Sequence, residues 1–140
     1  MKYALVDPNW DELRKLDENL LFKVMTGKVA EDKPELYEAV FCGECDDADC
    51  ATERGRAALA ERLFERFNIG DHGGLRIRSL SVGDLLVFDG GPTLLCAPAG
   101  WDEIDFDPKP DFSLTLLDAA RRADREIRKR DLEEAGLILD

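Results

Sequence analysis

The sequence predicts a small α+β domain in which helices pack on a mostly antiparallel sheet. Three observations support this fold class. Apolar runs and two-residue alternation in residues 35–42 and 85–88 are typical of strands. Apolar residues recur at helical spacing in residues 51–68, and Asp89-Gly-Gly-Pro92 is a hairpin-like turn. A chain of 140 residues with 44% hydrophobic content is long enough to bury one core.

The chain begins with a strand and a helix. Residues 2–6 are the first expected strand, closed by Asp7-Pro8, and Pro8 biases Asp7 away from helical geometry. A helix is expected over residues 11–25, either as one piece or as two pieces broken near Asp17. Asn9 or Asp11 can cap its start.

The second expected strand leads into the main helix. Residues 35–42 alternate and contain branched and aromatic side chains, which favour a strand. The acidic residues 43–50 are expected to form a turn-like loop. The helix then begins at Ala51 and runs through Asn68, with Thr52 or Asp49 as its cap.

Three strands and a last helix complete the fold. A flexible turn at residues 71–74 precedes the expected strands, which cover residues 85–88, 93–97 and 101–106. Pro108 and Pro110 mark a linker to a helix over residues 114–135. We therefore expect a core domain over residues 1–107 and an appendage over residues 108–140, whose Ala-rich stripe packs on the core or on a partner.

The charge of the chain is strongly negative and unevenly placed. The net charge is −12, and the residues from Phe112 onward carry six basic and seven acidic side chains, so the first 111 residues carry −11. Such a surface repels nucleic acid and anionic membranes and attracts basic protein surfaces, although it can also serve solubility alone. No stretch approaches the roughly 20 apolar residues of a membrane span, and the start of the chain is too soon interrupted by charge to be a signal peptide. A cytoplasmic protein is expected.

One part of the chain resembles a known family. The pieces are Glu65-Arg-Phe-Asn68, Arg78-Ser-Leu-Ser-Val-Gly-Asp84, the strand Leu85–Phe88, the strand Thr93–Ala97 and Gly100-Trp-Asp-Glu-Ile104. Over about residues 36–104 they resemble the YodL-like domain of plasmid, conjugative-element and phage proteins. The resemblance implies a protein of a mobile genetic element and assigns no catalytic or ligand-binding residue.

Much of this segment has a structural explanation. Gly83 is expected to adopt a backbone conformation that other residues resist. The Asp84 carboxylate is expected to accept a hydrogen bond from a backbone amide across the turn.

Four cysteines suggest a metal site. Cys42, Cys45 and Cys50 have C-x2-C-x4-C spacing, and the first pair has the spacing of a zinc knuckle because two thiolates two residues apart can reach one tetrahedral ion. Cys96 or His72 would be the fourth ligand. The alternative is a set of ordinary reduced thiols, because structural disulfides are not expected in a reducing cytoplasm. Zinc would then be absent and the protein would need no cofactor.

The acidic side chains form the other candidate site. If residues 102–107 are extended, Glu103, Asp105 and Asp107 share one face at a spacing of about 6.5–7 Å, comparable to the phosphates of a DNA strand, while Ile104 and Phe106 pack inward. The alternative is an edge strand protected by charge. The expected partner-binding residues are Glu44, Asp46, Asp47, Asp49, Asp102, Glu103, Asp105 and Asp107.

Enzyme motifs are absent. The chain contains no GxSxG elbow, no P-loop and no dinucleotide fingerprint, and His72 beside Asp71 is not a catalytic dyad. A pocket that gathers His72, Asp84 and Trp101 would favour an enzyme. The expected function is a non-enzymatic protein-binding module that engages a basic, nucleic-acid-binding host protein, for example as an anti-restriction or anti-CRISPR inhibitor. A small zinc-stabilised structural or regulatory module is the alternative.

Overall fold

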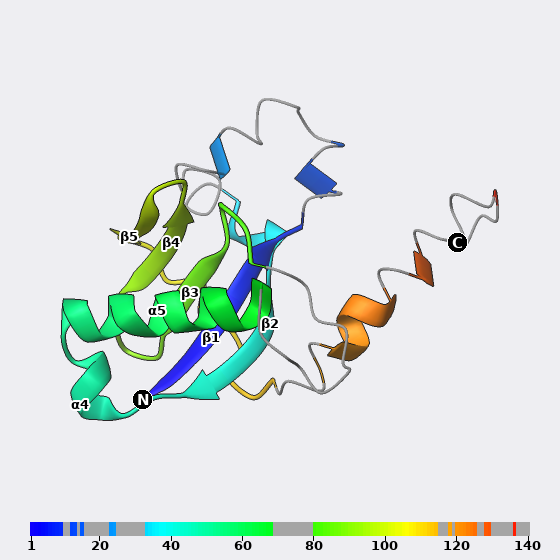
Figure 1. The fold of residues 1–140 in the computed structure, drawn as a ribbon. Helices are drawn as coiled ribbons and strands as arrows, with labels where there is room; N and C mark the ends of the chain where they lie inside the picture. Colours follow the sequence, from blue (N-terminus) through cyan, green and yellow to red (C-terminus); the bar gives the residue numbers. More distant parts are fainter. Residues whose placement is uncertain are drawn as a thin grey trace.

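A five-stranded antiparallel sheet forms the centre of the molecule, in the order β2-β1-β3-β4-β5 (Figure 1). The computed structural model describes residues 1–9, 12, 13, 15, 23, 24, 33–68, 80–114, 118, 120–125, 128, 129 and 136. The strands are β1 (Lys2–Pro8), β2 (Tyr37–Glu44), β3 (Leu85–Phe88), β4 (Thr93–Ala97) and β5 (Gly100–Ile104). This arrangement confirms the small α+β fold with an antiparallel sheet.

The bounds of three strands, β1, β2 and β5, differ from the sequence-based expectation. β1 continues through Pro8, and β2 begins at Tyr37 after the short 3-10 helix η1 (Pro34–Leu36). β5 ends at Ile104, two residues earlier than expected. The reason is register: Ile104 pairs with Thr93, the first residue of β4, so no strand remains for the following residues to pair with.

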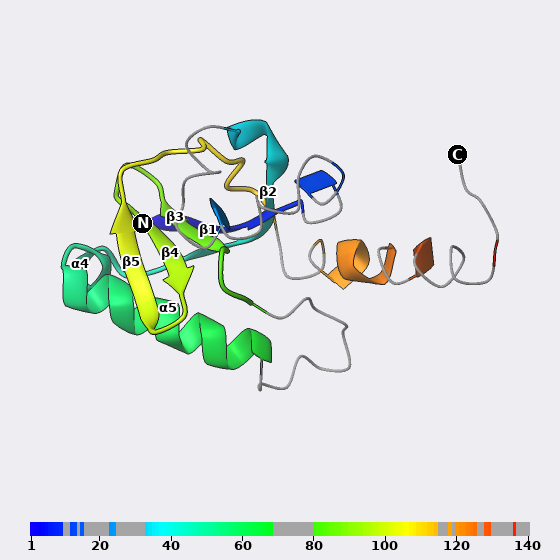
Figure 2. The same cartoon turned by 90° about the horizontal axis from the view of Figure 1, so that it is seen from above.

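Helix α5 (Glu53–Asn68) covers one face of the sheet, as Figures 1 and 2 show. Its buried side chains are Leu59, Ala60, Leu63 and Phe67, which recur every three or four residues and so lie on one stripe. They pack on side chains that point to the same face of the sheet, including Tyr3, Leu5, Phe41, Leu86, Phe88 and Leu94. Thr52 caps the helix by accepting a hydrogen bond from the Gly55 amide at 3.0 Å.

The opposite face of the sheet carries a second apolar cluster. Its members on the strands include Ala4, Val6, Tyr37, Cys42, Leu85, Val87 and Leu95. Leu13 and Val24 from the N-terminal helical residues cover them, and Ile104 and Phe106 pack against the same cluster, as the sequence suggested. In Figure 2 the yellow segment that contains residues 105–114 runs on the side of the sheet away from α5.

The connection between β2 and α5 is more regular than expected. Residues 47–50 form the short helix α4 (Asp47–Cys50) instead of a turn-like loop, because the Asp46 side chain caps it by accepting from the Ala48 amide at 3.2 Å. α4 packs closely on the start of α5. A Cβ atom added at Gly55 would lie 1.6 Å from the Asp49 carbonyl oxygen, so only glycine fits there.

The structure describes only some residues of the expected N-terminal helix. Residues 12, 13, 15, 23 and 24 are helical. The Asn9 side chain accepts a hydrogen bond from the Glu12 amide at 3.2 Å, so of the two candidate caps Asn9 fills this role. The break expected near Asp17 and the turn at residues 71–74 lie outside the described residues.

The C-terminal segment packs along the outer edge of β2. The Cys42 amide donates to the Leu114 carbonyl at 3.1 Å, and Arg122 donates to the Ala39 carbonyl at 3.1 Å and also binds the Glu38 carboxylate. Residues 118, 120–125, 128 and 129 are helical, with Ala120 and Ala123 buried. The appendage therefore satisfies backbone groups that an edge strand would otherwise expose.

Candidate functional site

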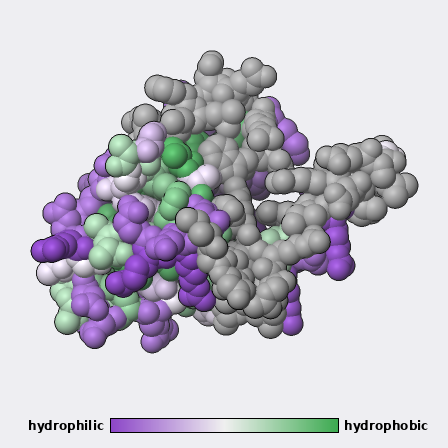
Figure 3. Space-filling view, viewed as in Figure 1, coloured by the Kyte–Doolittle hydropathy of each residue, from purple (hydrophilic) through white to green (hydrophobic). Residues whose placement is uncertain are grey.

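All eight carboxylates expected to bind a partner lie on the surface. Glu44, Asp46, Asp47 and Asp49 belong to the end of β2 and to α4, whereas Asp102, Glu103, Asp105 and Asp107 belong to β5 and the residues after it. Each of the eight side chains is exposed. Figure 3 shows hydrophilic side chains over the α4 and α5 side of the molecule.

Strand register brings the two acidic segments toward one end of the sheet. Glu44 pairs with Lys2 on β1, and the Asp89 amide of the β3–β4 turn bonds to the Lys2 carbonyl at 2.9 Å. β5 returns toward the same end, because Ile104 pairs with Thr93 at the start of β4. Asp105 therefore leaves the sheet at the end where Glu44 leads into α4.

Arg56 connects the two acidic segments directly. Its guanidinium donates to the Cys50 carbonyl at the end of α4 at 3.2 Å and to the Glu103 carboxylate of β5 at 2.9 Å. The Arg56 side chain is only 14% exposed, so this bridge is shielded from solvent more than an ordinary surface pair. One arginine thus holds α4 and β5 on either side of the first turns of α5.

The prediction that Glu103, Asp105 and Asp107 share one face of a strand is wrong. Only Glu103 lies within β5, and it points toward α5, where Arg56 binds it. Asp107 accepts a hydrogen bond from the Lys109 amide at 2.8 Å and so shapes a turn instead. The chain stops pairing after Ile104, so the regular spacing of an extended strand ends there.

Four of the eight carboxylates make no hydrogen bond or ion pair within the described part of the chain. Asp46 caps α4, Asp47 binds the N-terminal amine, Glu103 binds Arg56 and Asp107 binds the Lys109 amide. The remaining four are Glu44, Asp49, Asp102 and Asp105. We call these four residues the open carboxylates, because they can accept a donor from another molecule without breaking an internal contact.

The cysteines do not form the expected zinc set. Cys45 and Cys50 are joined by a disulfide across a sequence separation of five residues, which contradicts the expectation of reduced thiols and removes two of the expected thiolate ligands. Cys42 lies in the apolar cluster on the face of the sheet away from α5, with its Sγ atom 3.1 Å from the Asp111 carbonyl oxygen. No group of three or more metal-binding side chains gathers in the portion that the structure describes.

The two free cysteines are buried core residues. Cys42 and Cys96 are 8% and 3% exposed. Burial raises the pKa of the Cys42 thiol and raises that of Cys96 to about 11, where Asp84 adds a smaller effect of the same sign. Both thiols therefore remain protonated at neutral pH and are poor nucleophiles.

The residues that would favour an enzyme do not form a pocket in the described structure. Asp84 is fully buried and accepts a hydrogen bond from the Ser81 amide at 2.7 Å, as expected, while Gly83 has the positive φ of 100° that favours glycine. Burial, together with the charge of Asp84, raises the pKa of the Tyr37 hydroxyl. Trp101 is half-buried on β5, and His72 lies outside the described residues.

A groove lies beside the C-terminal helix instead. It has a volume of about 550 Å³, and its walls are Ala39 and Val40 of β2, Leu114, and the helical residues Asp118, Arg121, Arg122, Asp124 and Arg125. The sequence analysis did not single out these arginines. It also missed Arg56, although a signal was present: Arg56 precedes Leu59 by three residues and Ala60 by four, which places it on the buried stripe of α5.

Comparisons with known proteins leave the family open. No protein-family model, no curated protein and no solved structure matches this chain. Among the described residues, no helix combines the length and the apolar character needed to cross a membrane.

Proposed function

We propose that this protein is a non-enzymatic module of a mobile genetic element that binds a basic surface of a host protein. More specifically, we propose an inhibitor of restriction or CRISPR machinery that occupies a surface where nucleic acid would bind. In this proposal the protein does not bind nucleic acid itself, because its net charge of −12 repels phosphates.

The observation that carries the proposal is the juxtaposition of two acidic segments from distant parts of the sequence. Arg56 holds the end of α4 and Glu103 of β5 together, and the open carboxylates lie in and beside these two segments. Carboxylates without internal partners can form charge-assisted bonds to Arg and Lys, which are the side chains that line nucleic-acid channels. Resemblance to the YodL-like domain supports the link to mobile elements.

A charge-neutralising variant tests the site. The E44Q/D49N/D102N/D105N variant replaces the open carboxylates by neutral side chains of the same size and leaves the internal contacts of Asp46, Asp47, Glu103 and Asp107 intact. The matched control is E35Q/E53Q/E61Q/E65Q, which removes the same charge from exposed positions elsewhere. Both variants are added to DNA-cleavage assays with restriction complexes and RNA-guided nucleases.

We expect the wild type and the control to inhibit at least one of these nucleases and the site variant to lose inhibition by about tenfold or more. Inhibition should also weaken as salt rises from 50 to about 500 mM, because exposed charges are screened. Inhibition that is equal in both variants and indifferent to salt would reject the acidic site. Cleavage unaffected by the wild type throughout the panel would reject the nuclease as the partner.

The zinc-stabilised alternative loses its main support. The disulfide uses two of the expected ligands, Cys42 lies in an apolar cluster, and Cys96 is buried. Elemental analysis of protein purified without chelators decides the point, and about one equivalent of tightly bound zinc would restore the alternative.

A further inference from the structure

Specific contacts between β2 and the C-terminal segment define the groove beside the C-terminal helix. Arg122 fixes the helix to β2 by binding both the Ala39 carbonyl, at 3.1 Å, and the Glu38 carboxylate. The Leu114 carbonyl accepts from the Cys42 amide and fixes the start of the segment. Contacts at these two points fix the position of the C-terminal segment against β2. The groove between them has a volume of about 550 Å³, which is within the usual range for small-molecule sites.

The helix wall of the groove concentrates positive charge in an acidic protein. Arg121, Arg122 and Arg125 line it together with Asp118 and Asp124. Asp124 is bound by Arg128 at 3.1 Å, and Arg122 is committed to β2. Arg121 and Arg125, by contrast, are exposed and have no ion-pair partner in the described part of the chain.

The spacing of these two arginines suits one anionic group. Residues four apart on a helix lie on the same face with their Cβ atoms about 5–6 Å apart. Their long side chains can therefore converge on one carboxylate or phosphate, to which each guanidinium can donate N–H groups.

The other wall is apolar. Ala39, Val40 and Leu114 are half-buried and present aliphatic surface to the groove. Val40 is available because the β1–β2 register shifts at this point: Leu5 pairs with Phe41 and Val6 with Ala39, so Val40 has no partner on β1. The bulge thus supplies Val40 to the apolar wall of the groove.

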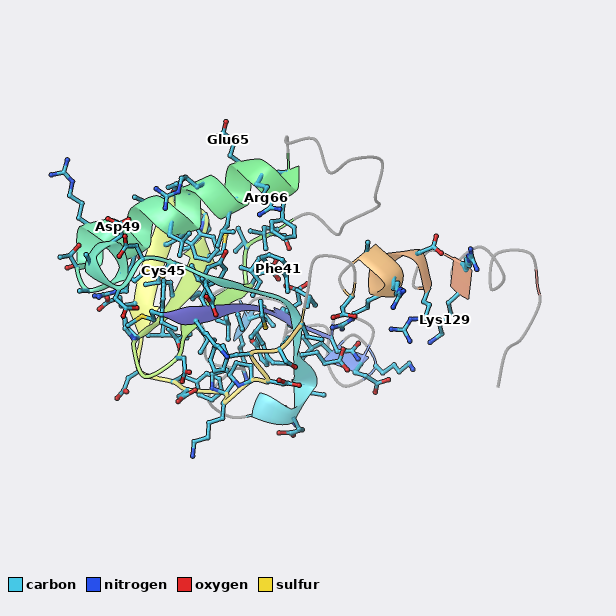
Figure 4. The ribbon with its side chains drawn as sticks, turned by 90° about the horizontal axis from the view of Figure 1, so that it is seen from below. Phe41, Cys45, Asp49, Glu65, Arg66 and Lys129 are labelled. Atoms are coloured by element: carbon cyan, nitrogen blue, oxygen red, sulfur yellow. A yellow bond between two sulfur atoms is a disulfide. The ribbon has the colours of Figure 1, made fainter. Side chains whose placement is uncertain are left out.

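We propose that this groove binds a small amphiphilic anion. Arg121 and Arg125 hold its carboxylate or phosphate head, and Val40 and Leu114 contact its short apolar body. The groove is separate from the acidic site, because in Figures 1 and 4 α4 lies on one side of the molecule and the C-terminal helix with Lys129 on the other. Ligand binding here does not depend on the proposed function.

The test uses a fluorescent probe of the same chemistry. 1-Anilinonaphthalene-8-sulfonate carries an anionic head and an apolar body, and its emission rises when the body leaves water. We compare the wild type, the R121Q/R125Q variant and the R54Q/R62Q control, which removes two positive charges from exposed positions of α5. Circular dichroism establishes that each variant is folded before titration.

The expected result is saturable binding by the wild type and the control, and binding about tenfold weaker in R121Q/R125Q. Octanoate should displace the probe, whereas acetate and octanol at equal concentration should not, because each supplies only half of the contacts. Equal binding by R121Q/R125Q and the wild type would overturn the assignment of the head group. Displacement by acetate as effective as that by octanoate would overturn the role assigned to the apolar wall.

Discussion

The Asn68 side chain binds both backbone groups of Leu80. The Leu80 amide donates to Asn68 Oδ1 at 2.7 Å, and Asn68 Nδ2 donates to the Leu80 carbonyl at 3.2 Å. Asn68 is the last residue of α5, and Leu80 is a buried residue shortly before β3. The pair therefore joins the end of α5 to the residues just before β3, and it connects two of the sequence motifs that suggested the YodL-like resemblance.

Replacing Asn68 by alanine should destabilise the protein by about 1–3 kcal/mol, because two partly buried backbone groups lose their partner. Urea unfolding followed by circular dichroism measures the change. E65A, at an exposed position on the same helix, is the control and should shift stability by less than about 0.5 kcal/mol. An N68A midpoint equal to that of E65A would contradict the role of this pair.

The Gly55→Ala variant should be less stable than the wild type, against the trend of helix propensity. Alanine in a helix interior is normally favoured over glycine by about 1 kcal/mol. Here the added Cβ would meet the Asp49 carbonyl oxygen at 1.6 Å, and backbone atoms cannot move aside cheaply. Thermal unfolding decides the sign, with A58G as a reference for propensity alone at an exposed position of α5. A rise in Tm for G55A would show that α4 does not pack on Gly55 in this way.

Thiol counts should reveal one disulfide and two buried thiols. Protein purified without reductant should show almost no reactive thiol at pH 7.5 when folded, because the Cys42 and Cys96 thiols are buried and protonated. It should show two thiols in guanidinium chloride and four after reduction, since the chain has four cysteines. Reduction should lower stability by about 2 kcal/mol in the chain-entropy account of a short loop. Four thiols in unreduced, denatured protein would exclude the bond between Cys45 and Cys50.

Stability should fall as the pH rises above about 9. The Cys96 pKa is about 11 in the folded state against an ordinary value of 9.0, so between these values the folded state holds a proton that the unfolded state has lost. The contribution is fully present below pH 9 and is lost as pH rises through 11. The buried Cys42 thiol and the Tyr37 hydroxyl, whose pKa values are also raised, act in the same direction. Unfolding curves of the wild type and C96A between pH 7 and 11 measure the effect, and C96A should show the shallower decline. Parallel pH dependences in the two proteins would contradict this assignment.

Much of the fold could be predicted because it depends on local patterns. The apolar stripe of α5, the strand runs of β3 and β4 and the turn between them are all readable from spacings of two to four residues. The Asp84–Ser81 contact and the conformation of Gly83 were readable for the same reason, since both involve neighbours in sequence.

The predictions failed where distant residues decide the outcome. The end of β5 depends on where β4 begins, and so the row of acidic residues from Glu103 onward could not be placed from its own sequence. The disulfide was missed for a different reason, because the cysteine spacing fits a zinc knuckle as well as a disulfide. The Asp46 cap starts the short helix α4, and this local turn brings Cys50 back to Cys45.

The sequence by itself determined the class of fold, the negative charge and the identity of the acidic segments, because composition and short-range periodicity depend on neighbouring residues alone. Only the tertiary structure decided which carboxylates remain open, since Arg56 and the N-terminal amine occupy others across the fold. It also created the groove between β2 and the C-terminal helix, whose walls are about 80 residues apart in the chain, as in the Ala39–Arg122 contact with a separation of 83. Long-range pairing and packing produce these sites, and no local pattern encodes them.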